Sequence, residues 1–110
     1  MDKTPALDAL AAMAHETRLD VFRSLVQAGP EGLAAGEIAT MHDVVQNTMS
    51  SHLATLSRAG LITRNRSGRS IRYSANYQTM QSLLLYLLED CCRGDAQICA
   101  PIAEAMACHC

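Results

Sequence analysis

Residues 46–74, QNTMSSHLATLSRAGLITRNRSGRSIRYS, contain two hydrophobic periodicities in succession. The first half spaces Met49, Leu53 and Leu56 along one face of an amphipathic helix, and Gly60 stands where a C-terminal cap is expected. The second half alternates around RSGR, where Gly68 can adopt the positive φ that a tight turn requires. The stretch therefore predicts a helix over residues 46–60 followed by a β-hairpin.

Four further helices are predicted around this stretch. Apolar residues recur at helical spacing over 6–14, 16–29 and 33–42, and again over 76–92. Only a few residues separate the third helix from the fourth, so these two form a helix-turn-helix whose second helix is expected in the DNA major groove. The predicted fold is mainly α with a β-hairpin wing: a single winged helix-turn-helix domain over residues 1–110 with about five helices.

Three segments carry a resemblance to a known family: MAHETRLDVFRSL (13–25), TMSSHLATLSRAGLI (48–62) and RSGRSIRYSAN (66–76). Over about residues 6–92 the chain resembles the ArsR/SmtB family of metal-responsive dimeric repressors. The resemblance implies that the first and last helices form a twofold dimer. The segment 36–45 lacks the C-x-C of some arsenic and cadmium sensors, and the last helix lacks the Asp, His and Glu set of zinc sensors. The known metal sites of the family therefore cannot be copied by position.

The start of the helix predicted over residues 46–60 is polar and uncharged, which suits hydrogen bonds to base edges and phosphates. The alternative is a solvated helix face with Ser and Asn as local caps, but within this arrangement of elements the sequence favours DNA. The candidate DNA-binding residues of this helix are Gln46, Asn47, Thr48, Ser50, Ser51 and His52.

Charge is distributed unevenly along the chain, although the net charge is only −2. Residues 44–88 contain five Arg and no acid, between two acidic ends. Guanidinium groups on the hairpin could bind phosphate or enter the minor groove, whereas the alternative is a charged edge that keeps the strands from pairing with other chains. Because the cluster contains positive residues and no acid, the sequence favours the DNA-binding interpretation. The members of the cluster are Arg58, Arg64, Arg66, Arg69 and Arg72.

Three of the five cysteines lie within CCRGDAQIC, residues 91–99. Adjacent Cα atoms are about 3.8 Å apart, too close for an ordinary disulfide between Cys91 and Cys92. Gly94 could end the helix and let the chain bring Cys99 back to the pair. Three thiolates without a His or carboxylate select a soft ion, and As(III) or Sb(III) favours pyramidal coordination by three sulfurs. The predicted metalloid site is Cys91, Cys92 and Cys99, followed by a short tail over 100–110 in which Cys108 and Cys110 form at most a looser site.

These patterns together predict a homodimeric repressor that binds operator DNA without ligand and dissociates when arsenite or antimonite binds. The N-terminus lacks a secretory signal, so a cytoplasmic location with reduced thiols is expected, and no membrane partner. Alternatives are a repressor responsive to zinc, cadmium or methylarsenicals, or a thiol-redox switch that pairs Cys99 with Cys91 or Cys92. The Arg-rich hairpin speaks against a metal-sequestering protein or a thiol enzyme. No organic cofactor is expected. The sequence contains no evident pair of nucleophile and base, so an enzyme is not expected either.

Overall fold

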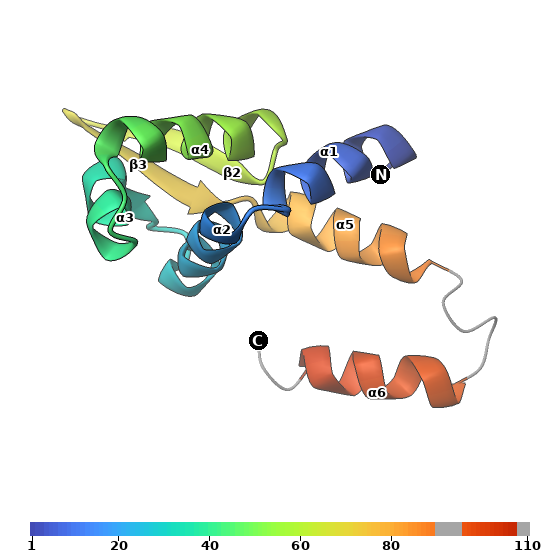
Figure 1. Ribbon diagram of the computed structural model, residues 1–110. Coiled ribbons are helices and arrows are strands. Elements are labelled where there is room, and N and C mark those ends of the chain that lie inside the picture. The colour runs from blue at the N-terminus through green and yellow to red at the C-terminus, as the bar shows by residue number, and fades with distance from the viewer. Residues whose placement is uncertain (90–95, 108–110) are drawn as a thin grey trace.

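A computed structural model describes residues 1–89 and 96–107 of the chain. Its helices are α1 (Lys3–Met13), α2 (Glu16–Ala28), α3 (Ala35–Met41), α4 (Gln46–Arg58), α5 (Tyr77–Leu88) and α6 (Ala96–Ala107). The strands are β1 (Leu33–Ala34), β2 (Ile62–Ser67) and β3 (Ser70–Ala75). The elements form a winged helix-turn-helix, as the sequence predicts: α3 and α4 make the helix-turn-helix, and β2 and β3 project beside it as the wing (Figure 1).

The three strands form an antiparallel sheet in the order β1-β3-β2. In the hairpin Arg64 pairs with Tyr73 and Arg66 with Ile71, and Gly68 in the turn has the expected positive φ of 62°. Strand β1 lies in a segment that the sequence assigned to a helix. Gly32 precedes it with a φ of 70°, and a Cβ there would collide with the backbone carbonyl of Tyr73. Glycine therefore allows the chain to approach β3 closely enough for β1 to pair.

The core lies where α1, α2, α3, α4 and the base of the hairpin meet. The three residues that periodicity placed inward on α4, Met49, Leu53 and Leu56, are all buried, which confirms that prediction. Their buried neighbours come from α2, α3 and the connection between α4 and β2: Val21, Phe22, Leu25, Ile38 and Leu61. Tyr77 fastens α5 to this core, since its hydroxyl donates to the backbone oxygen of Val26 at 3.1 Å. The position of α4 is thus fixed by contacts on its inner face, which leaves the outer face free to bind.

The C-terminal part of the chain differs from the sequence prediction in two respects. Helix α5 ends at Leu88, four residues before the expected Cys92, because acidic residues such as Glu89 are unfavourable at the negative end of a helix dipole. Residues 96–107, expected to be a loop and a tail, form the sixth helix even though Pro101 lies inside it. Alanine-rich composition gives this segment a high helix propensity. The sequence prediction instead had the chain fold back after Gly94 to bring Cys99 to Cys91 and Cys92. Within the two described ranges, no helix is both long and apolar enough to cross a membrane.

Candidate nucleic-acid interface

Helix α4 presents a polar outer face opposite its buried one. Of the six residues of this helix start predicted to bind DNA, five are exposed and His52 is partly buried. The hydroxyl of Thr55 donates to the backbone oxygen of Ser51 at 3.1 Å, and Arg58 donates to the Thr55 hydroxyl at 3.4 Å. The side chains toward the helix start remain available as donors and acceptors along one continuous surface. The residues concerned are Gln46, Asn47, Thr48, Ser50 and Ser51.

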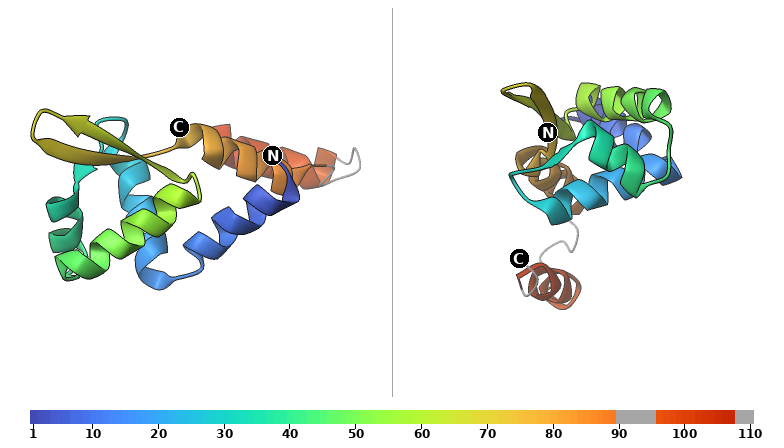
Figure 2. Two further views of the ribbon diagram at one scale, coloured as in Figure 1. Left: turned by 90° about the horizontal axis from the view of Figure 1, so that it is seen from above. Right: turned by 90° about the vertical axis from the view of Figure 1, so that its left-hand side faces the viewer.

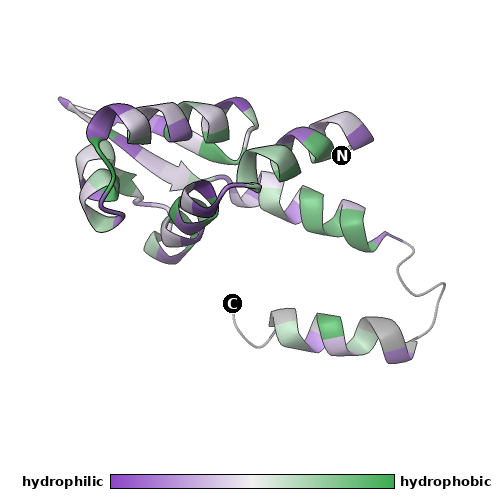
Figure 3. Cartoon of the chain, viewed as in Figure 1, coloured by the Kyte–Doolittle hydropathy of each residue, from purple (hydrophilic) through white to green (hydrophobic). Residues whose placement is uncertain are grey.

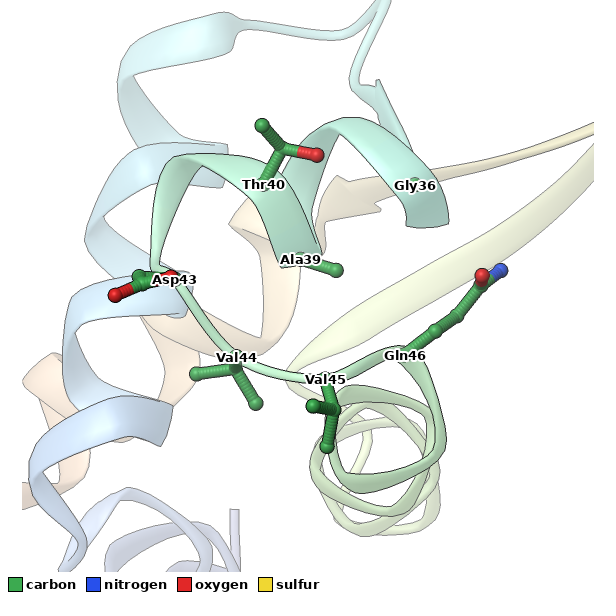
Figure 4. A pocket seen from close by; sticks show the side chains of 7 residues that line it. All are labelled: Gly36, Ala39, Thr40, Asp43, Val44, Val45 and Gln46. Carbon is green, nitrogen blue, oxygen red and sulfur yellow. The ribbon is translucent and has the colours of Figure 1, made fainter.

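The turn before α4 sets the angle at which this face is presented. Asp43 adopts a left-handed conformation with φ 51°, which an aspartate tolerates better than most residues, and the chain reverses within a few residues. Figure 4 shows Val44 and Val45 following one another through the turn, and Gln46 at the first turn of α4, around a hollow of about 480 Å³. Val45 is the N-cap residue and offers no side-chain cap, so the amides at the start of α4 are left for other acceptors.

The wing carries exposed arginines on both sides of its turn. Arg64, Arg66 and Arg69 are exposed. Of the three, only Arg66 forms a hydrogen bond to another described residue, from its Nε to the backbone oxygen of Gly68 at 3.3 Å. Seen from above, α4 lies between this hairpin and the connection between α1 and α2 (Figure 2). The arginines therefore flank the recognition helix on one side, as a wing that binds DNA backbone requires.

Arg72 is set apart from the other arginines of the hairpin. Its guanidinium donates to the backbone oxygens of Glu31 and Gly32, at 3.0 and 2.9 Å, and lies 3.7 Å from the carboxylate of Glu37. These contacts hold β3 against the chain that leads into β1 and α3. The structure thus gives Arg72, a predicted DNA-binding residue, a role in positioning the sheet.

The connection between α1 and α2 adds residues that the sequence prediction did not include. His15 caps α2, with its Nδ1 accepting from the Thr17 amide at 3.2 Å, and its ring lies 4.6 Å from that of His52. Burial lowers the pKa of His52, and the nearby His15 and Arg18 lower it further. Arg18 belongs to an acid-rich part of the sequence, so only the packing of α2 against α4 identifies it as part of this surface.

The predicted metalloid site falls outside what the structure describes. Cys91 and Cys92 lie in the segment 90–95, and Cys108 and Cys110 lie in the segment 108–110; both segments are outside the described residues. Cys99 lies in α6, but only its backbone is described. Among the side chains that are described, no group of three or more His, Cys, Asp or Glu residues is placed to hold a metal ion. The sulfur ligand set therefore stays a prediction, and the described residues offer no competing site.

Comparisons with known proteins agree with this architecture. A helix-turn-helix domain family matches residues 13–65. Over 73 residues the chain is 40% identical to a Halobacterium salinarum protein named arsenical resistance operon repressor ArsR. The match covers 63% of the chain and 56% of that relative, so the chain spans little more than half of the relative's length. It is 27% identical to the transcriptional activator HlyU of Vibrio cholerae, covering 82% of the chain and 81% of HlyU. A solved ArsR-like transcriptional regulator from Rhodococcus superposes with a TM-score of 0.68 at 26% identity, over 96% of the chain and 89% of that structure.

Proposed function

The chain belongs to the ArsR/SmtB family of winged helix-turn-helix transcription regulators, a family of DNA-binding proteins rather than enzymes, and from that premise we propose a specific role. It is a repressor that binds operator DNA as a homodimer and leaves the DNA when As(III) or Sb(III) binds to its cysteines. The single observation that carries the DNA-binding part is the position of the exposed polar face of α4 beside the exposed arginines of the wing.

The dimer is supported by apolar side chains that the single chain leaves exposed. Leu7 and Leu10 on α1 and Leu85 and Leu87 on α5 are exposed, Leu85 to 71%. Figure 3 shows the apolar colouring concentrated on the second half of α5. Exposed apolar residues on two neighbouring helices are a common sign of a protein interface, and a domain of 110 residues gains core from a partner. A dimer formed through α1 and α5 would contain two recognition helices, each positioned to bind one half-site of the operator.

The soft-ion part of the proposal rests on the chemistry of the donor set. Cys91 and Cys92 are the third and fourth residues after the end of α5, and Cys99 belongs to α6. A ligand shared by all three would join the dimer helix to the last helix. Three thiolates suit a soft ion such as As(III) or Sb(III). The name of the Halobacterium relative, with its reference to arsenical resistance, supports the same ligand class. Reduced thiols are needed for this chemistry, which fits a cytoplasmic location.

A selection experiment followed by titration tests the proposal. We expect the purified protein to select one twofold-symmetric site from random DNA and to bind it about 10³-fold or more tightly than random sequence at the same salt concentration. As(III) and Sb(III) are expected to release this DNA, whereas Zn(II), Cd(II), a methylarsenite and hydrogen peroxide are not. Failure to select any site would contradict the proposed DNA binding, and release by one of the other agents alone would assign the switch to that alternative.

A further inference from the structure

A basic corner lies beside the recognition helix, on the side away from the wing. It is formed by His15 and Arg18 at the start of α2 and by His52 on α4. Because Nδ1 of His15 accepts a hydrogen bond from the Thr17 amide, the neutral ring carries its proton on Nε2 and can donate with that atom. The two rings lie 4.6 Å apart at an angle of 48°, so the corner is compact.

Arg18 lines a hollow of about 430 Å³ together with residues of the polar face of α4. Its lining from α4 consists of Asn47, Thr48, Ser51, His52 and Thr55. The Nε atom of Arg18 is buried and has no hydrogen-bond partner among the described residues. A buried guanidinium nitrogen without an acceptor is unfavourable. Because this Nε is closed to solvent, an outside ligand would contact the guanidinium of Arg18 through its other nitrogens.

Among the described residues, no carboxylate lies within ion-pair distance of the corner. The described residues contain one ion pair within 4.0 Å, that between Arg72 and Glu37, and Arg18 has none. Asp8 of α1 lines an adjoining hollow with Arg18 and Arg58, but beyond that distance. Burial is the main reason that the pKa of His52 is lowered, and the neighbouring His15 and Arg18 lower it further. An anion with several acceptor oxygens would therefore complement the unpaired charge of Arg18.

We infer that Arg18, with the hydroxyls of Thr48 and Ser51, binds one phosphate of the DNA backbone. The inference rests on the proposed DNA binding and adds a second anchor to it. In Figure 2 the wing and the connection between α1 and α2 lie on opposite sides of α4. A helix in the major groove lies between the two sugar-phosphate backbones, so the wing would bind one strand and the Arg18 corner the other. Phosphate contacts on both sides fix the depth and angle of the helix in the groove.

The test is a cycle that combines a protein variant with neutralised phosphates. Single methylphosphonates are placed along the selected operator, and affinities of the wild type and Arg18→Gln are measured at several salt concentrations. We expect Arg18→Gln to lower affinity about 10-fold and to reduce the salt slope by about 0.9, as one lost phosphate contact does. One methylphosphonate per half-site should weaken the wild type and have no further effect on Arg18→Gln.

Arg23→Gln is the matched control, since Arg23 is an exposed arginine on the same helix that lines a different hollow, with His42. It should keep the full effect of every methylphosphonate. Arg18→Lys retains the charge and should keep most of the salt slope. If Arg18→Gln fails to fold, Ser51→Ala on the exposed face of α4 takes its place and should be weakened less than the wild type by the same methylphosphonate. If every methylphosphonate weakens the wild type and the variant used equally, the Arg18 site is excluded. If the wild type binds no DNA, the proposed function itself fails.

Discussion

Two arginines of one hairpin show how neighbouring residues of the same type take different roles. Arg66 is exposed at the end of β2, whereas Arg72 on β3 donates two hydrogen bonds to backbone carbonyls of residues 31 and 32. In the sequence both belong to one basic cluster, and nothing in their spacing separates them. The difference arises because β3 is the central strand of the sheet and Arg72 can reach the chain that enters β1.

Replacing Arg72 by Ala is expected to lower the free energy of unfolding by about 1–2 kcal/mol, because two carbonyls lose a charged donor at a partly exposed site. Arg66→Ala should leave stability within about 0.5 kcal/mol, since that side chain is exposed. Urea unfolding of both variants measures the difference. Equal stability of the two variants would show that Arg72 does not fasten the sheet.

His52 is expected to make stability depend on pH. Its pKa in the folded protein lies below 6.5, because of burial and the nearby His15 and Arg18, so the unfolded chain binds more protons between the two pKa values. Stability should therefore be full above pH 6.5 and fall as the pH drops below it. When the pH is lowered from 7.5 to 5.5, the Tm measured by thermal unfolding should fall less for His52→Gln than for the wild type. An identical pH dependence would mean that another group causes the fall.

At the scale of elements, the wing is expected to bind phosphate without reading sequence. Arg66→Ala with Arg69→Ala should weaken binding to specific and random DNA alike and should reduce the salt slope by about 0.9 for each lost phosphate contact. Affinity measured over a salt series tests this, with Arg23→Ala as a control on a different surface. An unchanged slope in the double variant would remove the wing from the interface.

The start of α4 is expected to read bases. Ala at Gln46 or Ser50 should cost about 1–3 kcal/mol on the selected operator if the residue makes a good base contact, and much less on random DNA. Competition binding with both DNA types measures the ratio. Equal losses on the two DNAs would show that α4 only positions the protein. Both variants keep Met49, Leu53 and Leu56, so the fold should be unaffected.

Elements with a strong local signal were predictable from the sequence, and those that depend on distant partners were not. The inward residues of α4 and the glycine turn of the hairpin follow from periodicity and from Gly68. Strand β1 has only two residues and exists because β3 offers it a partner. The role of Arg18 likewise required the packing of α2 beside α4. Helix α6 was missed because the chain after Gly94 was expected to fold back and bring Cys99 to Cys91 and Cys92, although the alanines of this segment favour a helix.

At the scale of the whole molecule, the switch connects the cysteines to the dimer. A ligand releases the repressor only if it binds the released conformation more tightly, and couplings of about 1–3 kcal/mol are typical. Capture of Cys99 beside Cys91 and Cys92 would close a short loop between α5 and α6, directly after the helix proposed for the dimer. Because dimeric readers need half-sites about one DNA turn apart, a small change in dimer packing would weaken contacts in both.

The most direct test of this account is operator release by arsenite from single Cys→Ser variants at positions 91, 92 and 99, measured by fluorescence anisotropy under reducing conditions. Cys108→Ser, outside the proposed ligand set, is the matched control and should release DNA as the wild type does. Each of the three variants should bind the operator nearly normally and stay bound when arsenite is added. Full arsenite-driven release from all three would contradict the mechanism, and loss of DNA binding without arsenite would make these cysteines structural instead.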